Sequence, residues 1–498
     1  MDRGTRHILV VGGGTAGCVL AARLSEKRNL SVTLLEAGPD HDVYDSAVFD
    51  PARASEAWTG GVAPVATTRM ATETGGIPMV QGRVLGGTSA INGLATLRGL
   101  PPDYDAWAAA GLAGWGWDDV VSTFIAAERD LDFGPSAIHG GTGPLPVRRW
   151  RRDELSRAHR AYYDGMVETG QPVVADINDP SQLPGIGVFP VTIDDQGRRV
   201  TTSLAYLTAH VRARPNLEVR TNAEVATLAF DGRRATGVTL VSGQQLEASE
   251  VILAAGALWS PTLLLRSGIG PAEQLADRGI ASRVDLPVGA TMSDHLGPGI
   301  LYGHDGPRGG IAGPAQVVLV GASNGTDVDY HAFPIASSPT DDATRFMMAV
   351  FLMRSSGRGS VRLAESPQAD PIVTAPPLPD GAHDRLRHAF DRLAAWERSA
   401  AARNLGCEPV EPHNLMAPDA VATALDRVTL SYAHMTSTCP MGPVLDADCR
   451  VIGIEGLRVC DASVMPTIPS GNTYLGCVMV AERVARKMLR ELTRGRAA

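Results

Sequence analysis

Hydrophobic and polar positions in the first forty residues follow the order strand, helix, strand. A short apolar run, Ile8–Val11, leads into a glycine-rich turn, a helical pattern covers Cys18–Leu24, and a second apolar run occupies Val32–Leu35. Apolar runs of this length, joined through a helix, are typical of buried parallel strands. The pattern therefore predicts a parallel sheet at the start of the chain.

Past residue 40, the same reading predicts further strands and helices. Apolar runs bounded by turn residues predict strands at 217–221, 225–230, 237–241 and 251–255. Helical spacing of apolar residues predicts helices within 103–129 and at 152–169, 203–213 and 381–404. Another helix is expected to begin with Ser260 as its N-cap and Pro261 as its first residue. Residues 39–80 are expected to be irregular, and residues 134–144 to form a surface loop.

Polarity alternates between residues 310 and 375, which predicts an antiparallel sheet. Together the patterns predict an α/β fold, with a discontinuous Rossmann-like nucleotide-binding domain and a substrate domain made of an antiparallel β-sheet with helices. We expect the nucleotide-binding domain to comprise residues 1–155, 200–295 and 436–498. The substrate domain is expected to comprise residues 156–199 and 296–435.

The composition is that of a globular protein with more than one domain. The chain has 498 residues, of which 44% are hydrophobic and 20% are charged, and two or three domains are typical of this length. The net charge of −9 and the lack of a basic run argue against nucleic acid as a partner. No apolar stretch is long enough for a transmembrane segment, and the first apolar run is too short for a secretory signal.

The six cysteines are scattered and include no C-x-x-C pair, so we expect no metal site. Free thiols suit a reducing compartment, and we expect a cytoplasmic protein. The sequence leaves the oligomeric state open.

A turn with the spacing G-x-G-x-x-G joins the first predicted strand to the first predicted helix. Gly12 permits a sharp turn, Gly14 lets a pyrophosphate approach the backbone, and Gly17 lets the helix pack against the sheet. The helix N-terminus offers unpaired N–H groups to the phosphates. Glu36, 19 residues after Gly17, is placed to accept hydrogen bonds from ribose hydroxyls and to repel a 2′-phosphate. The motif predicts an adenine dinucleotide without distinguishing NAD from FAD.

Three further segments agree with this motif. They are Gly82–Gly93, the stretch Gly256–Gly270 with Ser260-Pro261 inside it, and Gly456–Glu482. With the N-terminal motif they resemble the signatures of the glucose–methanol–choline (GMC) oxidoreductases, a family of FAD-dependent alcohol oxidases and dehydrogenases. The resemblance extends from about residue 6 to about residue 488 and implies that the dinucleotide is FAD.

The resemblance also implies how FAD lies. The second glycine segment is expected at the pyrophosphate and isoalloxazine ring, the Val225 backbone at the adenine, and Asp461 near the ribityl chain. Some relatives attach FAD covalently through a histidine, and Ile91 stands at the corresponding position here, so noncovalent FAD is expected. The cofactor-binding residues implied are Gly12, Gly14, Thr15, Ala16, Gly17, Glu36, Ala37, Arg83, Leu85, Gly86, Gly87, Ser89, Asn92, Gly93, Val225, Ala255, Gly256, Asp461, Ala462, Asn472 and Thr473.

Hydride transfer from an alcohol requires a base that takes the hydroxyl proton, and a neutral histidine suits this role. Among the twelve histidines, His434 lies four residues before Thr438-Cys439, in a segment that resembles the family's catalytic-histidine segment. His434 is therefore the candidate base, the alternative being a hydrogen-bonded histidine at a domain boundary. His295 is expected to be structural, His139 to be exposed or to anchor its loop, and His331 to be a core residue or to line the substrate cavity.

In the family, a second histidine or an asparagine shares the alcohol oxygen with the base. Counting back from Glu482 assigns this position to Tyr474, whose hydroxyl can donate a hydrogen bond to an alkoxide or can simply fill space.

The leading hypothesis is an FAD-dependent oxidase or dehydrogenase of a small-molecule alcohol, with O2 or an unidentified carrier as electron acceptor. The alternatives are a flavin-containing lyase or decarboxylase on the same fold and a non-catalytic flavoprotein. An NAD-dependent dehydrogenase is the least favoured hypothesis.

Overall fold

The structure is a computed structural model that describes residues 6–59, 63–72, 75–306, 309, 313–336 and 345–494. Its first sheet is parallel and draws on distant parts of the chain. The strand order is β10-β2-β1-β14-β23, with β1 at Arg6–Val11, β2 at Leu30–Leu35, β10 at Leu217–Arg220, β14 at Glu250–Leu253 and β23 at Leu457–Val459. The predicted discontinuous, Rossmann-like sheet is thus confirmed.

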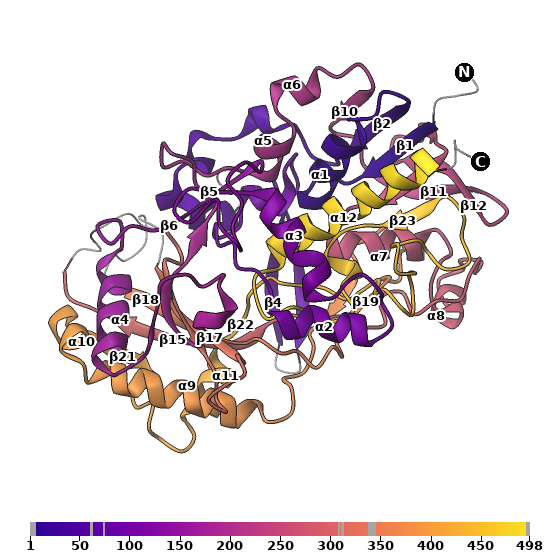
Figure 1. Cartoon of the computed structure of the whole chain (residues 1–498). Coiled ribbons are helices and arrows are strands. Elements are labelled where there is room, and N and C mark those ends of the chain that lie inside the picture. The colour runs from indigo at the N-terminus through magenta and orange to yellow at the C-terminus, as the bar shows by residue number, and fades with distance from the viewer. Residues whose placement is uncertain are drawn as a thin grey trace.

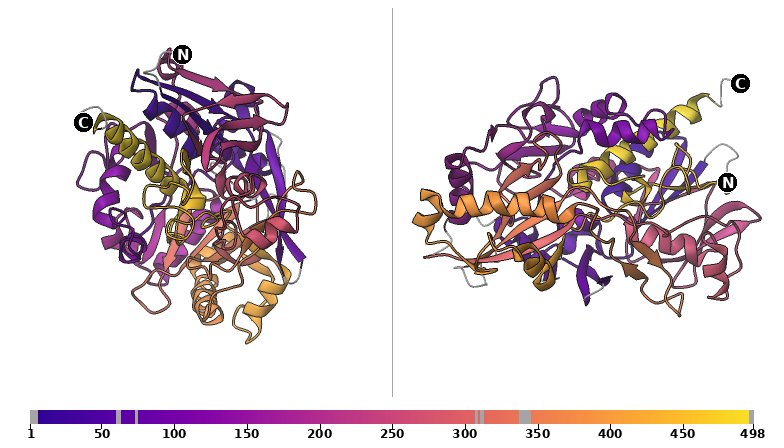
Figure 2. Two further views of the ribbon diagram at one scale, coloured as in Figure 1. Left: turned by 90° about the vertical axis from the view of Figure 1, so that its right-hand side faces the viewer. Right: turned by 90° about the horizontal axis from the view of Figure 1, so that it is seen from below.

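Helices from both ends of the chain cover the parallel sheet. Helix α1 (Thr15–Leu24) packs beside α12 (Thr473–Arg494), which runs in yellow along this lobe in Figure 1. Helix α12 also contacts α3 (Trp117–Ala127), which in turn contacts α2 (Pro101–Ala109). The two views of Figure 2 show the start of β1 and the end of α12 at the same end of the molecule.

The second lobe contains the predicted antiparallel sheet, whose order is β21-β15-β18-β17-β16-β8-β7. Its pairs are antiparallel except for β7 with β8, and β22 also pairs with β15. The strands are β7 (Val173–Val174), β8 (Gly185–Val188), β15 (Leu296–Gly303), β16 (Val317–Gly321), β17 (Tyr330–Ala336), β18 (Arg345–Leu352), β21 (Glu408–Glu411) and β22 (Thr429–Ser431). The helices that pack on it or on one another are α4 (Arg157–Glu168), α9 (Ala382–Glu397), α10 (Ala400–Leu405) and α11 (Ala420–Arg427).

Smaller sheets complete the fold. One has the order β19-β20-β3-β4, another β11-β12-β13, and a third β5-β6-β9. Their strands are β3 (Val65–Thr72), β4 (Gly75–Gly82), β5 (Glu128–Asp130), β6 (Leu145–Arg149), β9 (Pro190–Val191), β11 (Val225–Asp231), β12 (Arg234–Leu240), β13 (Gln245–Glu247), β19 (Ser360–Arg362) and β20 (Ile372–Thr374). The prediction that residues 39–80 are irregular is therefore wrong, because their last part forms β3 and most of β4.

Helix α7 (Gly256–Arg266) begins earlier than predicted. Ser260 is not its N-cap, and Pro261 lies inside it rather than at its first position. A proline has no N–H to donate to the carbonyl four residues back. Here that carbonyl, of Ala257, accepts a hydrogen bond from the Thr438 hydroxyl at 2.7 Å. The replacement donor satisfies the acceptor that a proline within a helix would otherwise leave unpaired.

Two other predicted helices are divided in the structure. The expected helix 381–404 consists of α9 and α10, because the Ser399 hydroxyl accepts a hydrogen bond from the Ala402 N–H and caps a new helix. The expected helix 203–213 consists of α5 (Thr202–Tyr206) and α6 (Ala209–Arg212). Thr208 caps α6 in the same way, through a hydrogen bond from the Val211 N–H. Side-chain caps thus explain both breaks.

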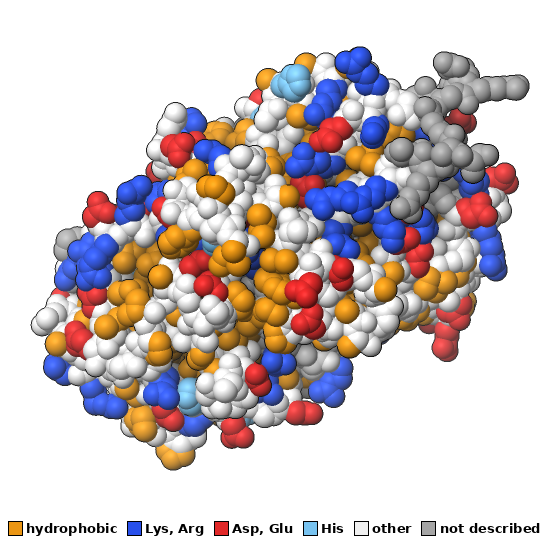
Figure 3. All heavy atoms as spheres, viewed as in Figure 1, with side chains coloured by type: hydrophobic (Ala, Val, Ile, Leu, Met, Phe, Trp, Pro, Cys, Tyr) orange, Lys and Arg blue, Asp and Glu red, His pale blue; other side chains and the backbone are white. Residues whose placement is uncertain are grey.

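Basic and acidic side chains are interspersed over the face of the molecule seen in Figure 3. Within the part of the chain that the structure describes, no helix combines the length and apolar character needed to span a bilayer.

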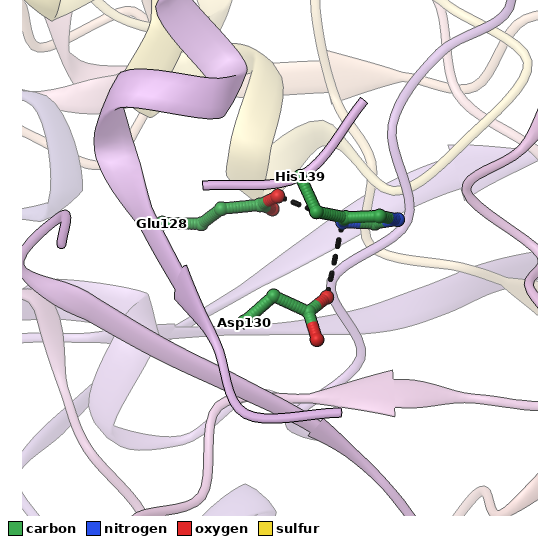
Figure 4. A group of neighbouring side chains, drawn as sticks. All are labelled: Glu128, Asp130 and His139. Carbon is green, nitrogen blue, oxygen red and sulfur yellow. Dashed lines mark hydrogen bonds and ion pairs between the residues drawn. The ribbon is translucent and has the colours of Figure 1, made fainter. Parts of the chain in front are cut away.

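A buried cluster of charges lies beneath the loop 134–144. His139 is 2% exposed, so the expectation that it is exposed is wrong, whereas it does anchor its loop. Figure 4 shows His139 in contact with the carboxylates of both Glu128 and Asp130. The distances are 2.8 Å from Nδ1 to Glu128 Oε1, 3.0 Å from Nδ1 to Asp130 Oδ2, and 2.6 Å from Nε2 to Asp176 Oδ2. Both ring nitrogens donate to carboxylates, so the ring is an imidazolium.

The cluster is balanced in charge. Arg149 contacts Asp130 and Asp176, and Arg98 contacts Glu128 at 2.6 Å, so three cations face three carboxylates. Glu128, Asp130 and His139 are spaced as metal ligands could be, but here the imidazolium itself supplies the positive charge. Because the backbone N–H of Arg98 also donates to Asn178 at 2.8 Å, the cluster fixes the segment that follows the second glycine motif.

We predict that His139→Gln destabilises the fold most at neutral and acidic pH. Burial alone would lower the pKa of His139, but its bonds to Asp130, Asp176 and Glu128 raise this pKa to about 10. A raised pKa contributes stability that is complete below the unfolded value of about 6.5 and is lost as the pH rises towards 10. We expect a loss of about 3 kcal/mol at pH 6, typical of breaking a buried ion pair.

The measurement is thermal unfolding of both proteins between pH 6 and pH 10. The difference in unfolding temperature is expected to shrink as the pH rises, because the wild-type ring then loses its proton. A difference that stays constant over this range would contradict the imidazolium assignment.

Candidate functional site

A cavity of about 900 Å³ lies where the two large sheets meet. It is lined by residues that follow the carboxyl ends of β1, β2 and β14 and by residues of β17 and β18. The carboxyl end of a parallel sheet is where open α/β folds bind their ligands.

The first glycine motif forms one wall of the cavity. A Cβ atom on Gly17 would lie 1.8 Å from the Gly12 carbonyl oxygen, so only glycine allows α1 to start this close to β1. A Cβ atom on Gly87 would lie 2.7 Å from the Gly14 Cα atom, so the two glycine motifs meet backbone to backbone. The Gly86 N–H donates to the Gly13 carbonyl at 2.8 Å and joins them further. The N-terminus of α1 therefore borders the cavity, and no side chain caps it.

Glu36 lines the cavity at the end of β2, as its predicted ribose role requires. Its carboxylate accepts the Gly13 N–H at 2.8 Å and the Gly38 N–H at 2.9 Å. Burial raises the pKa of this carboxyl group, while these N–H groups act in the opposite direction. Glu36 thus also holds the glycine turn in shape.

Most of the predicted cofactor residues line the cavity. Gly17, Leu85 and Gly86 do not and instead support its wall from behind. The Leu85 carbonyl, for example, accepts a hydrogen bond from Tyr44. The predicted residues on the lining are Gly12, Gly14, Thr15, Ala16, Glu36, Ala37, Arg83, Gly87, Ser89, Asn92, Gly93, Val225, Ala255, Gly256, Asp461, Ala462, Asn472 and Thr473.

Sequence reasoning missed the contribution of β4, whose Pro78–Gly82 segment forms part of the lining. Gln81 accepts a hydrogen bond from the Trp259 indole at 3.0 Å, and both residues border the cavity. The β-branched residues Val65, Thr67 and Thr68 were the available signal for this hairpin.

His434 lies at the cavity wall and is 7% exposed. Its Nε2 atom is 3.1 Å from the Asn472 Nδ2 atom, and its Nδ1 atom is 2.9 Å from the Nδ1 atom of His295. Burial lowers the pKa of His434 to about 3, and the nearby His331 acts in the same direction. The imidazole is therefore neutral at physiological pH.

The partners of His434 determine which ring nitrogen carries the lone pair that can act as a base. The Asn472 amide donates to Nε2, so Nε2 carries the lone pair and the ring proton is on Nδ1. That proton is donated to His295, whose own pKa burial lowers well below the ordinary value. Buried Asp294 accepts the backbone N–H groups of both histidines, at 2.8 and 2.9 Å. His295 thus contacts the candidate base directly, which the sequence did not predict, whereas His331 is buried and does not line the cavity.

The residue beside His434 is Asn472 rather than Tyr474. Tyr474 borders the cavity, but its hydroxyl group forms a hydrogen bond with Thr202 at 3.0 Å. The Asn472 Oδ1 atom and the Tyr432 hydroxyl are both buried and have no hydrogen-bond partner in the described residues. Because Asn472 and Tyr432 also line the cavity, these atoms are available to a ligand there.

Aromatic rings extend the site away from His434. The Tyr432 ring stacks on His434 with 4.1 Å between centroids and on Phe351 with 4.3 Å between centroids. Phe333 lies 5.3 Å from Tyr432. The lining residues that lie on or next to β16, β17, β18 and β22 and surround this stack are uncharged: Pro314, Ala315, Phe333, Ile335, Phe351, Leu430, Ser431 and Tyr432. A charged residue, Asp370, lies elsewhere on the lining, just before β20.

Comparison with known proteins agrees with this geometry. Two GMC oxidoreductase models match residues 6–297 and 355–481. The chain is 34% identical over 530 residues to 5-(hydroxymethyl)furfural oxidase of Methylovorus sp. (strain MP688), covering 97% of this chain and 98% of that protein. It is 32% identical over 533 residues to oxygen-dependent choline dehydrogenase of Burkholderia multivorans, covering 96% and 93%.

Among solved structures, the fold matches pyridoxine 4-oxidase from Mesorbium loti with a TM-score of 0.87 and 28% identity. That match covers 97% of this chain and 99% of the oxidase. This similarity extends over the full length of the chain. It agrees with the parallel sheet and its glycine turn, and with the second sheet over the cavity. The chain belongs to the GMC oxidoreductase family, whose members are FAD-dependent oxidoreductases.

Proposed function

We propose that this chain is an FAD-dependent oxidase or dehydrogenase of alcohols that binds FAD noncovalently and uses His434 as its base. The observation that carries the proposal is the pair formed by His434 Nε2 and Asn472 Nδ2, which lie 3.1 Å apart at the cavity wall. An alcohol hydroxyl that replaces the hydrogen bond between them can donate its proton to the Nε2 lone pair, while its oxygen accepts a hydrogen bond from Nδ2.

The residues around the cavity fit FAD. The N-terminus of α1, which no side chain caps, offers N–H groups to a pyrophosphate. Glu36 lines the cavity at the end of β2, where it can accept hydrogen bonds from ribose hydroxyls. Ile91, which replaces the histidine that attaches FAD in some relatives, is buried and lines the cavity. An isoleucine side chain has no nucleophilic atom, which supports noncovalent binding.

Bound FAD supplies the electron acceptor for the hydride. The protein supplies the proton acceptor and the orientation. His434 Nε2 takes the hydroxyl proton of the alcohol, and Asn472 Nδ2 then donates to the resulting oxygen and stabilises its negative charge. His295 keeps the His434 proton on Nδ1, so that Nε2 is ready to accept another. The surrounding apolar rings exclude water and strengthen these interactions.

The uncharged, aromatic part of the lining beside His434 supports a neutral alcohol with an apolar or aromatic body as the substrate. Both faces of the Tyr432 ring are covered, by His434 and by Phe351, so this ring offers no open face to a quaternary ammonium group. The names of the 5-(hydroxymethyl)furfural oxidase and pyridoxine 4-oxidase relatives agree with such a substrate. Their description as oxidases supports O2 as the electron acceptor.

The direct test is anaerobic mixing of the FAD-loaded protein with 5-(hydroxymethyl)furfural, benzyl alcohol and choline, followed by absorbance at the flavin band. We expect the two aromatic alcohols to bleach the flavin, and air to restore its colour. Conversion of a compound without bleaching would favour a lyase or decarboxylase instead.

We predict that His434→Ala slows flavin reduction by the best alcohol by at least about 10²-fold, the usual scale for a lost acid–base group. Stopped-flow absorbance without oxygen gives the rate, and bound FAD per protein serves as the folding check. His210→Ala is a suitable control because His210 is exposed on α6. Near-normal reduction by His434→Ala would remove this residue from the mechanism.

A paired substitution distinguishes Asn472 from Tyr474. We predict that Asn472→Ala slows flavin reduction about 10²-fold, the scale for losing one donor to a developing oxyanion. Tyr474→Phe is expected to reduce the rate by less than about fivefold, since the lost hydroxyl contacts Thr202 rather than His434. If Tyr474→Phe slowed flavin reduction more than Asn472→Ala, Tyr474 rather than Asn472 would be the hydrogen-bond donor to the alcohol oxygen.

A further inference from the structure

Arg199 is a fully buried cation behind the wall of the cavity, with 1% of its surface exposed. Its Nε atom donates to the Val48 carbonyl at 3.0 Å, and its Nη1 atom donates to the Asn92 Oδ1 atom at 2.9 Å. A longer contact of 3.4 Å joins Nη1 to the Ser89 carbonyl. The Nη2 atom is buried and has no hydrogen-bond partner in the described residues.

No carboxylate of the described residues forms an ion pair with Arg199. Burial lowers its pKa to about 10, which leaves the guanidinium charged at neutral pH. A buried charge without a counter-charge is costly to a fold, and proteins usually pair such groups or use them. The buried arginines Arg98, Arg149 and Arg458 each contact carboxylates, at 2.6 Å for Arg98 and Arg458, and this contrast sets Arg199 apart.

Asn92 links Arg199 to the cavity. Its Oδ1 atom accepts hydrogen bonds from Arg199 and from the Leu94 N–H, the latter at 3.1 Å. Because both partners are donors, they identify this atom as the amide oxygen. The Nδ2 donor is then on the other side of the amide, without a protein partner in the described residues, and Asn92 lines the cavity beside Ser89.

We propose that Arg199 is a positioning and electrostatic residue for the cofactor. It turns the Asn92 Nδ2 donor toward bound FAD. It also places near FAD, which is an anion, a positive charge that no carboxylate of the described residues neutralises. This inference rests on one part of the proposed function, namely that FAD binds in the cavity. Reduction of FAD by a hydride adds two electrons and one proton, so reduced FAD carries one more negative charge than oxidised FAD. The charge of Arg199 therefore also favours the reduced form and raises the reduction potential.

The test compares Arg199→Met, which removes the charge, with Arg199→Lys, which retains it. Two quantities are measured without any alcohol: the dissociation constant of FAD from the apoprotein, and the equilibrium of flavin reduction against a dye of known potential. Arg198→Met is the matched control, because Arg198 is next in the chain but exposed and paired with Asp194.

We expect Arg199→Met to bind FAD at least tenfold more weakly and to shift the dye equilibrium at least tenfold toward oxidised flavin, about 30 mV for two electrons. Arg199→Lys is expected to remain within threefold of the wild-type protein in the dye equilibrium, and Arg198→Met within twofold in both quantities. A purely structural arginine would not separate the Met and Lys variants by potential. A wild-type dye equilibrium in Arg199→Met would overturn the proposal.

Asn92→Asp tests the same link with Arg199 in place. The variant keeps an oxygen for Arg199 and Leu94 to donate to, replaces the cavity-facing donor with an acceptor, and gives Arg199 a counter-charge. We expect weaker FAD binding and a lower potential, in the same direction as Arg199→Met. If Arg199→Met does not fold, Asn92→Asp provides the test. Wild-type FAD affinity and a wild-type dye equilibrium in Asn92→Asp would then overturn the proposal. If the wild-type protein oxidised no alcohol, only the proposed function would be overturned, because FAD binding and the dye equilibrium are both measured without alcohol.

Discussion

Backbone contact between two glycine segments is the constraint on which the cavity depends. Gly14 and Gly87 approach so closely that a Cβ atom on Gly87 would lie 2.7 Å from the Gly14 Cα atom. This contact brings the N-terminus of α1 and the segment that carries Ser89 and Asn92 to one wall. Larger residues would separate the two segments, and the helix would then no longer face the same space as the second motif. Arg98 lies further along the same segment and belongs to the charge cluster around His139, which fixes the continuation of the segment.

Burial then determines the chemistry that this wall can support. His434 and His139 are both almost inaccessible, yet their pKa values move in opposite directions, to about 3 and to about 10. His434 faces an amide and another neutral imidazole, so desolvation is not compensated and the ring stays neutral. His139 faces carboxylates that more than compensate for desolvation. One histidine is thereby kept neutral, as a base must be, and the other is a structural cation, although neither state is visible in the residue type.

The sequence predicts what is encoded locally. Glycine spacing and apolar runs were sufficient to predict the parallel sheet and its discontinuity. The resemblance to the GMC family supplied most of the cavity lining and, through the segment around His434, the candidate base. Contacts between distant residues were not predictable in this way. His295 and His434 are 139 positions apart but share a hydrogen bond, and the proline within α7 is tolerated only because Thr438, from a remote segment, replaces its missing donor. The β3–β4 hairpin was missed because its edge strand β4 contains Gly75, Gly76 and Pro78, residue types that are typical of turns.

The misplacement of the second polar residue has a geometric cause in helix α12. Tyr474 and Glu482 are eight positions apart, or about 80° around the axis of an α-helix, so both side chains can contact the same neighbouring element. That element is α5: the Tyr474 hydroxyl bonds to Thr202, and Glu482 accepts from the Tyr206 hydroxyl at 2.9 Å. Counting back from Glu482 along the sequence therefore selected a residue that faces α5. Asn472 precedes the first residue of α12, so its side chain is not held against α5 and can reach His434. A count along the sequence does not reveal this difference, because it depends on the residue at which the helix begins.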